Sequence, residues 1–220
     1  FAVPVPPLDQ QRQIVAVLDK AFAGIATATA NAQKNLINAQ ALFERHLQSI
    51  LTQGDEGWTE YSFDQVCSIS SKLVDPRLPD YLDLPHIGAG NMISRTGEIV
   101  DVLTARQEGL KSGKFLFDPS MVLYSKIRPY LMKVCRPNFS GLCSADVYPL
   151  VPKAGLLYRD MLFHILMSDG FTAYAEAGSA RAGMPKVNRD HLFKYSVWLP
   201  DVKMQKAISE NLDDLALKCQ

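Results

Sequence analysis

Basic side chains that could bind phosphate groups gather in two stretches of this chain. Between Lys111 and Arg136 there are six basic residues and a single acidic residue, Asp118. The second stretch contains Arg181, Lys186, Arg189 and Lys194. Lysines and arginines neutralise nucleic-acid phosphates, but a run of charges is as often only a solvated face. Both stretches are therefore candidate phosphate-binding surfaces, with a solvated face as the alternative.

The segment Tyr124–Tyr130 is the first candidate for contact, because basic and aromatic residues are interleaved there and Phe139 follows. If it is extended, Lys126, Arg128 and Tyr130 share one face. Arginine can pair with guanine edges and asparagine with adenine edges. The candidate nucleic-acid-binding residues are Lys126, Arg128, Tyr130, Lys133, Ser144, Arg181, Lys186, Asn188, Arg189 and Asn91. The alternative for each is a surface salt bridge or helix cap, and for Tyr130 a place in the core.

Motifs typical of enzymes are missing from the sequence. Gly88-Ala89-Gly90 lacks the third glycine of a dinucleotide-binding loop, so a turn is the better interpretation. Asp201 and Lys203 have a spacing found in some nucleases, but no supporting carboxylates accompany them. The histidines have no triad context, and the cysteines show no C-x-x-C spacing. We expect no catalytic residue, no metal site and no cofactor.

Length and composition indicate an ordinary folded protein. The 220 residues have a formal net charge of zero, with 47% hydrophobic and 21% charged residues. We find no run of the roughly 18–20 apolar residues that a membrane span needs, and the first residues do not resemble a signal peptide. The cysteine pattern favours reduced thiols, so we expect a cytoplasmic protein without a membrane partner.

A long helix is predicted from about Leu8 to Thr52, because prolines precede it and no proline interrupts it. Apolar residues recur along it about every 3.5 positions, which indicates a coiled-coil seam. The seam residues are Ile14, Leu18, Ala21, Ile25, Ala28, Ala32, Leu36, Ala39, Phe43 and Leu47. Such a rod would be about 65–70 Å long and would need a partner helix. We expect a homodimer through this helix, with an ordinary bundle helix as the alternative.

The segment after Gly57 shows no continuous helical periodicity, and its pattern predicts an α+β domain with a mixed β-sheet. The expected strands are the runs 66–70, 84–90, 98–103, 121–127 and 145–151, with a last one at 195–199. One or two helices are expected over Tyr158–Ala175, and a short helix near Arg189–Phe193.

The beginning of the chain resembles its end. Residues 3–19 match residues 197–213 at a constant offset of 194. The identical pairs are Val3/Val197, Pro6/Pro200, Gln11/Gln205, Ile14/Ile208, Leu18/Leu212 and Asp19/Asp213. An extended run, a proline and a helix start thus occur twice, which predicts one module of a larger, pseudo-symmetric protein.

Several motifs resemble those of type I restriction-modification specificity subunits. The segment 4–51 resembles the family's central conserved region, and FDPSMVLYSKIRPYLMKV, GLCSADVYPL and MPKVNRDHLFKYSVWLP resemble its target-recognition domain. The resemblance implies four parts: the end of a preceding recognition-domain strand (1–7), a spacer helix (8–53), a target-recognition domain (54–200) and the start of a second spacer helix (201–220).

The resemblance also implies a function. In this family each recognition domain binds one half of a split DNA sequence, and paired spacer helices fix the gap. The expected partners are double-stranded DNA, methylase subunits that supply S-adenosylmethionine chemistry, and a restriction subunit. The chain would then be a non-catalytic DNA-recognition subunit that docks the methylases. The alternative is a coiled-coil oligomerisation scaffold whose globular domain binds protein.

Overall fold

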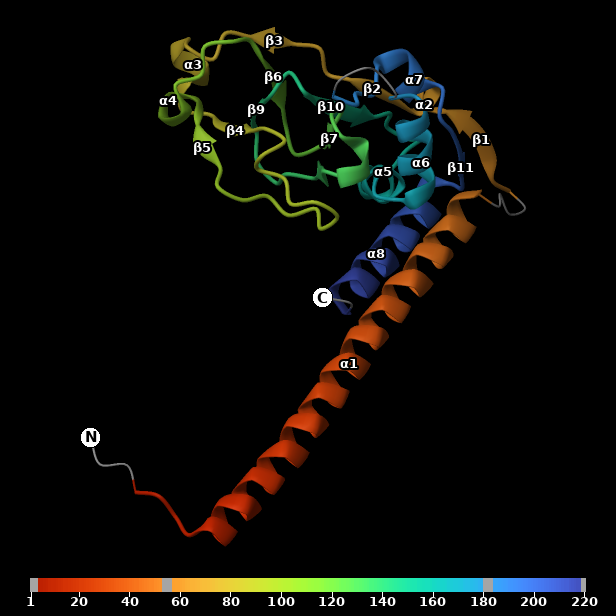
Figure 1. The fold of residues 1–220 in the computed structure, drawn as a ribbon. Helices are drawn as coiled ribbons and strands as arrows, with labels where there is room; N and C mark the ends of the chain where they lie inside the picture. Colours follow the sequence, from red (N-terminus) through yellow and green to blue (C-terminus); the bar gives the residue numbers. More distant parts are fainter. Residues whose placement is uncertain (1–3, 53–56, 180–183, 219–220) are drawn as a thin grey trace.

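The computed structural model describes residues 4–52, 57–179 and 184–218, with the side chains of residues 40, 43, 44, 46–48, 50–52, 217 and 218 outside the description. A globular part follows residue 57, and two helices leave it on the same side (Figure 1). The α+β class with a long helix is confirmed.

Helix α1 spans Leu8–Thr52, the range predicted from the sequence. Pro6 and Pro7 precede it, and the amide nitrogen of Gln11 donates to the carbonyl oxygen of Pro7 at 3.0 Å. Most of its described side chains are exposed, including the seam residues Ile14 and Leu18. The seam residues Phe43 and Leu47 lie outside the described side chains. A lone chain therefore leaves the first part of the seam uncovered.

The expectation about membrane spans was wrong in one respect. An 18-residue window within Leu8–Ala39 has a mean hydropathy of 1.2, which makes this part of the helix, by length and composition alone, apolar enough to cross a membrane. Its many alanines raise the mean, although no continuous apolar run there approaches 18 residues. One such helix is weak support for a membrane location.

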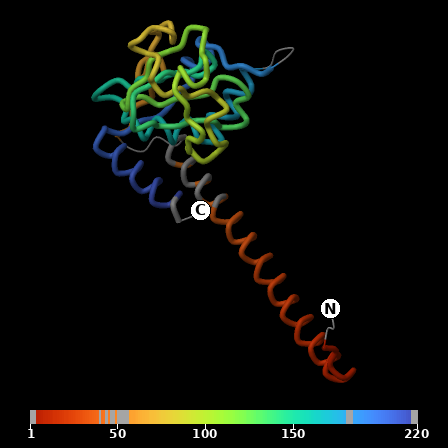
Figure 2. The backbone as a smooth tube through the Cα atoms, turned by 90° about the vertical axis from the view of Figure 1, so that its left-hand side faces the viewer, coloured from red at the N-terminus to blue at the C-terminus, as the bar shows by residue number. Residues whose placement is uncertain are grey.

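Helix α8 spans Val202–Lys218 and runs antiparallel to the C-terminal half of α1 (Figures 1 and 2). The two helices contact each other there. The start of α8 is the second copy of the internal repeat, so both copies of the repeated sequence form a helix.

The globular part contains three sheets. Strands β1 (Thr59–Ser62) and β11 (Ser196–Leu199) pair as an antiparallel ribbon. The four-stranded antiparallel sheet has the order β2 (Cys67–Ile69), β10 (Val147–Pro152), β7 (Val122–Ser125) and β8 (Val134–Cys135). The five-stranded sheet has the order β3 (Leu73–Val74), β6 (Lys114–Phe117), β9 (Gly141–Cys143), β4 (Pro85–Ile87) and β5 (Leu103–Thr104). The parallel pair β4–β9 makes this sheet mixed, as predicted.

The helices of the globular part pack on the four-stranded sheet. These are α5 (Arg159–Leu166), α6 (Asp169–Ala177) and α7 (Arg189–Phe193). Shorter turns of helix are α2 (Phe63–Val66), α3 (Pro79–Leu82), α4 (Ala105–Glu108) and the 3-10 helix η1 (Pro129–Leu131). Ser168 caps α6, because its hydroxyl accepts from the amide of Phe171 at 3.1 Å. A core around Phe63, Tyr124 and Leu162 joins sheet and helices.

The strands predicted from apolar runs correspond to β2, β4, β7, β10 and β11. The run 98–103 differs, because only Leu103 enters a strand and Ile99 forms an isolated bridge with Met92. Strands β1, β3, β6, β8 and β9 were not predicted. Each has two to four residues, and none lies in one of the longer apolar runs from which the other strands were predicted.

Candidate nucleic-acid interface

The structure brings the two basic stretches of the sequence together. Ile127 and Lys186 form an isolated antiparallel β-bridge. On either side of it, the amide of Arg128 donates to Pro185 O at 2.9 Å, and the amide of Val187 donates to Lys126 O at 2.8 Å. Segments 126–128 and 185–187 are thus held side by side. We name the surface formed by Lys126, Arg128, Asp146, Lys186 and Arg189 the basic face.

Asp146 lies between the two lysines of the basic face. Its Oδ1 atom is 3.1 Å from Lys186 Nζ and 3.9 Å from Lys126 Nζ. Only 13% of the Lys126 side chain is exposed, against 44% for Lys186. Burial and then the positive charge of Lys186 lower the pKa of Lys126. Lys186 is therefore the more available phosphate ligand, whereas Lys126 mainly supports the face from below.

Tyr148 forms the floor beneath these cations. Its hydroxyl donates to Val187 O at 3.2 Å, and its ring lies 5.0 Å from Lys126 Nζ. The guanidinium of Arg189 lies 6.0 Å from the same ring. A ring at these distances attracts both cations and limits their movement. Tyr148 was not singled out in the sequence, because it lies inside an apolar strand without a distinguishing spacing.

Arg128 is exposed, but it does not lie in an extended segment. Its backbone is left-handed, with φ 50° and ψ 62°, and the 3-10 helix η1 follows at once. Pro129 occupies the first position of η1, where its fixed φ is favourable. The strand alternation that would place Lys126, Arg128 and Tyr130 on one face therefore ends here. The prediction of one shared strand face is therefore wrong. Tyr130 is 46% exposed and is not part of the core.

Tyr124 is a core residue and Phe139 is partly buried against the core, which corrects their suggested place on a binding surface. Tyr124 is buried, and its ring packs edge-on against Phe171 at 5.4 Å. Phe139 packs against Phe117 at 5.8 Å. The buried Tyr124 ring cannot stack on a base in this conformation.

Lys133 and Ser144 border the loop that follows β4. Lys133 Nζ donates to Ala89 O at 2.6 Å, and the amide of Ser144 donates to Ile87 O at 3.0 Å. The Ser144 hydroxyl accepts from the amide of Asp146 at 3.3 Å. These bonds connect the loop to Asp146, so this candidate pair adjoins the basic face.

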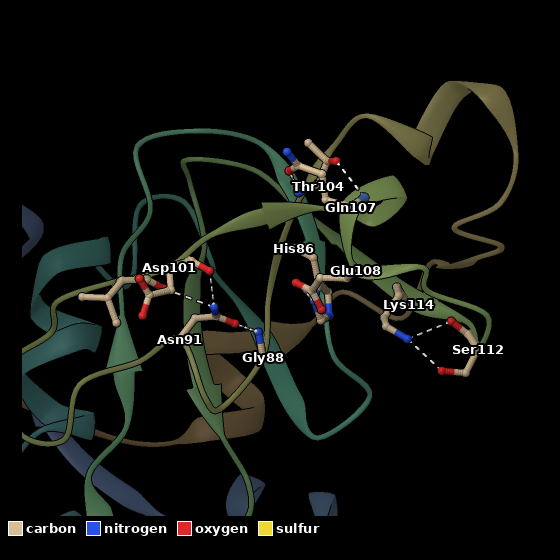
Figure 3. A network of polar contacts seen from close by, with 10 residues as sticks. His86, Gly88, Asn91, Asp101, Thr104, Gln107, Glu108, Ser112 and Lys114 are labelled. Atoms are coloured by element: carbon tan, nitrogen blue, oxygen red, sulfur yellow. Dashed lines mark hydrogen bonds and ion pairs between the residues drawn. The ribbon is translucent and has the colours of Figure 1, made fainter.

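Asn91 holds the same loop closed (Figure 3). Its Oδ1 accepts from the amide of Gly88 at 2.8 Å, and its Nδ2 donates to Val100 O at 3.2 Å and Asp101 O at 3.0 Å. Asn188 caps α7, because its Oδ1 accepts from the amide of His191 at 2.8 Å. Both amides therefore have structural partners. The candidate Arg181 lies outside the described residues.

Some residues of the first basic stretch lie away from the basic face. Lys114 is buried at the β3–β6 edge, where its Nζ donates to Ser112 Oγ at 2.7 Å. Arg136 points instead to the helices: its Nη1 lies 3.0 Å from Asp160 on α5, and its Nη2 donates to Asp213 on α8 at 2.5 Å. The stretch 111–136 is therefore not one continuous surface.

The described residues show little sign of catalytic chemistry. Within residues 4–52, 57–179 and 184–218, no three His, Cys, Asp or Glu side chains are grouped to hold a metal. His86 contacts Glu108 at 3.0 Å, and His191 stacks on Tyr174 (Figure 3 shows the former pair). Burial raises the pKa of the Cys67 and Cys135 thiols to about 12, which makes them poor nucleophiles.

Comparison with known proteins agrees with this fold. No family model matches the chain. The chain is 35% identical over 158 residues to the EcoDI type I restriction enzyme specificity subunit of Escherichia coli, which covers 72% of this chain and 34% of that relative. The fold resembles a chain from a structure concerned with complex assembly and conformational transition of the type I R-M system. The TM-score is 0.73 at 17% identity, over 99% of this chain and 54% of the other.

A second solved structure is similar. It is the HsdS subunit from Thermoanaerobacter tengcongensis, with a TM-score of 0.66 at 18% identity, over 99% of this chain and 53% of that one. The chain thus spans about a third of the curated relative and about half of the solved chains. By sequence, the chain is related to the proteins of type I restriction-modification systems, and the two solved chains share its fold. Within that class, the chain belongs to the family of specificity subunits.

Proposed function

We propose that this chain recognises one half of a bipartite DNA target on behalf of a type I restriction-modification complex. The observation that carries the proposal is the joining of segments 126–128 and 185–187 into one basic face, in a chain related to a specificity subunit. Residues 54–200 form the target-recognition domain in this proposal. Residues 8–53 and 201–220 are the two spacer helices, and residues 1–7 correspond to the end of a preceding recognition domain.

The basic face suits two different kinds of DNA contact. The half-buried Lys186 and the exposed Arg189 are cations that can neutralise phosphates, which provides affinity without sequence information. Arg128 projects from a fixed left-handed backbone and can pair with the O6 and N7 atoms of guanine. Asp146 accepts a hydrogen bond from Lys186, and the ring of Tyr148 lies beside the guanidinium of Arg189. These contacts hold the two cations in place.

The chemistry would belong to partner subunits. In the proposed complex, methylase subunits dock on the chain and supply S-adenosylmethionine and methyl transfer, and a restriction subunit adds cleavage. The chain itself would be non-catalytic, would need no cofactor, and would act in the cytoplasm.

The uncovered helix suggests how the chain associates. Ile14, Leu18 and Ile25 are large apolar residues that α1 leaves exposed in a single chain. A second long helix would remove them from water, so we expect self-association as a homodimer through α1. Sedimentation of the chain as a monomer at tens of micromolar would count against this expectation. Ala28→Glu should weaken the dimer by placing a charge in the seam.

Binding to duplex DNA across a salt series tests the main proposal. If three or four phosphates are neutralised, the logarithm of the binding constant should fall with log salt with a slope of about −3 to −4. The alternative function, a scaffold whose globular domain binds protein, predicts weak DNA binding and no such slope.

A further inference from the structure

Helix α8 is attached to the globular part by a buried glutamine. Gln205 is fully buried, and its Oε1 accepts from the amide of Tyr158 at 2.8 Å. Its Nε2 donates to Leu156 O at 2.8 Å and to Pro200 O at 2.8 Å. One side chain thus pairs three backbone groups at the start of α5 and at the turn into α8.

A charged cluster attaches the same helix two turns further on. Arg136 follows strand β8 and donates to Asp213 on α8, while its other nitrogen lies 3.0 Å from Asp160 on α5. Its guanidinium also lies 4.4 Å from the ring of Phe163. The Nε2 atom of the buried His164 is 3.0 Å from the Asp213 carboxylate. Between the polar groups, Leu212 is buried in the core of the globular part.

The attached residues lie on one face of α8. Positions 205, 209, 212 and 213 are spaced by whole turns of a helix, and Ser209 is buried between Gln205 and Leu212. We name the contact made by Gln205, Leu212, Asp213 and Arg136 the joint. Arg136 and Asp213 are charged and partly buried. Only a narrow range of α8 orientations therefore allows both this ion pair and the Gln205 hydrogen bonds to form.

The joint is also close, along the chain, to the basic face. Lys133 binds the loop next to Asp146, and the two residues of β8 lead directly from Lys133 to Arg136. Arg136 thus connects α5 and α8, through the two residues of β8, to Lys133 at the border of the proposed DNA surface.

The first copy of the internal repeat, at the start of α1, has the same glutamine, leucine and aspartate on its helix face but does not pack on the globular part. Gln11 repeats the local bond, because its Nε2 donates to Pro6 O at 2.6 Å. Leu18, the counterpart of Leu212, is nevertheless 47% exposed, against 1% for Leu212. Asp19, the counterpart of Asp213, is also exposed. The difference between the two copies is thus the contact with the globular part.

We propose that Gln205, Arg136 and Asp213 are positioning residues that fix the orientation of the globular part on its spacer helix. This inference rests on the proposed DNA-recognition function, because orientation matters for the distance between half-sites. In this account the joint determines at which gap a bipartite target is accepted, whereas the basic face determines which bases are preferred.

The distance between the two parts can be measured without DNA. Spin labels are placed on Asp214→Cys, at the outer end of α8, and on Lys111→Cys, at the β3–β6 edge, in a chain that also carries Cys219→Ser. Both labelled positions are exposed, and Cys67, Cys135 and Cys143 are buried. Pulsed electron paramagnetic resonance of the doubly labelled chain, diluted into an excess of unlabelled chain so that distances between the partners of a dimer do not contribute, then gives the distance distribution in the unmodified joint, where one narrow peak is expected.

Gln205→Leu and Arg136→Met should each broaden this peak or shift it by more than about 5 Å, one helical turn. The controls are Gln11→Leu, the same change as Gln205→Leu in the copy that docks on nothing in this chain, and Asp19→Asn, which removes the charge at the counterpart of Asp213, the partner of Arg136. They should leave the peak unchanged. If Gln205→Leu does not fold, Arg136→Lys, which keeps the charge and changes only its geometry, decides the question.

An unchanged peak in the folded joint variants would overturn the proposal, whatever the chain does with DNA. A second measurement uses the complex with methylase subunits. The joint variants should keep the base preference of the half-site but discriminate less between targets with one base pair added to or removed from the gap. Loss of base preference with an unchanged gap requirement would also overturn the proposal.

Discussion

The amide nitrogen of Arg128 donates a hydrogen bond of 2.9 Å to the carbonyl oxygen of Pro185. This bond stabilises the left-handed backbone conformation of Arg128. That conformation is unusual for a residue with a β-carbon and costs about 1 kcal/mol or more. The neighbouring Ile127–Lys186 bridge adds a second attachment. The side chain of Arg128 is thus presented from a rigid backbone, as a base-contacting residue requires.

Arg128 and Lys133 should affect DNA binding in different ways. If Arg128 contacts a guanine edge, Arg128→Ala should cost about 1–3 kcal/mol on the cognate half-site and relax the preference at one base position. If Lys133 only neutralises a phosphate, Lys133→Ala should weaken all sequences about equally and lower the salt slope by about one. Binding of both variants to cognate and scrambled duplexes distinguishes the two roles. Equal losses on both duplexes for Arg128→Ala would argue against base contact.

Asp146 should limit non-specific binding, because its carboxylate partly neutralises Lys186 at 3.1 Å. Asp146→Asn is expected to raise affinity for scrambled duplex about fivefold, as removal of one surface charge pair is worth up to about 1 kcal/mol. Asp83→Asn is the control, because Asp83 forms a similar exposed pair with Arg106 at 2.8 Å. An equal increase in both variants would show only an effect of net charge.

The joint should make folding sensitive to acid. Burial alone would raise the pKa of the Asp213 carboxyl, but its contacts with His164 and Arg136 outweigh burial and lower the pKa to about 2. A lowered pKa in the folded state adds stability above the unfolded value near 3.8, and that stability disappears as the pH falls towards 2.

Urea unfolding at several pH values measures whether the contribution of Asp213 to the free energy of unfolding decreases as the pH falls. Asp213→Asn should be less stable than the unmodified chain at pH 7, and the difference should shrink as the pH falls from about 5 to 2. Asp19→Asn, the change at the repeat counterpart, should alter stability little at any of these pH values. A pH-independent difference for Asp213→Asn would mean that its charge is unimportant.

Several features of this chain could be predicted from its sequence. Helix α1 was predicted with its bounds, because a proline start and a sustained apolar period are strong local signals. The repeat correctly indicated that the end of the chain starts a second helix. Lys186 and Arg128 were both candidates, but nothing in the sequence showed that a β-bridge joins their segments.

The remaining features depend on contacts between distant residues. Arg136 looked like one more cation of a basic stretch, yet it pairs with Asp160 and Asp213. Tyr124 looked like an aromatic residue of a surface, yet it is buried in the core. Local composition does not distinguish these cases, because burial is decided by which helix packs on which side of the sheet.

Gly141 is a sensitive point of the five-stranded sheet. A β-carbon there would lie 2.5 Å from Pro85 O and 2.8 Å from the ring of Phe117. Gly141→Ala should therefore destabilise the folded chain by about 1–3 kcal/mol through overpacking. Gly90→Ala is the control, because nothing lies within 4 Å of a β-carbon at that position. Urea unfolding should give a change within about 0.5 kcal/mol for the control, and similar losses in both would contradict the packing argument.

The most direct test of the DNA-binding account is the salt dependence of duplex binding after charge removal from the basic face. The double variant Lys186→Gln/Arg189→Gln is compared with Lys72→Gln/Lys111→Gln, which removes the same charge from exposed residues near the β3–β6 edge. We predict that the first variant lowers the magnitude of the salt slope by about two and weakens binding to all duplexes, since two phosphate contacts are lost. The second should leave the slope unchanged. An unchanged slope in the first variant, or an equal change in both, would contradict the assignment of the basic face.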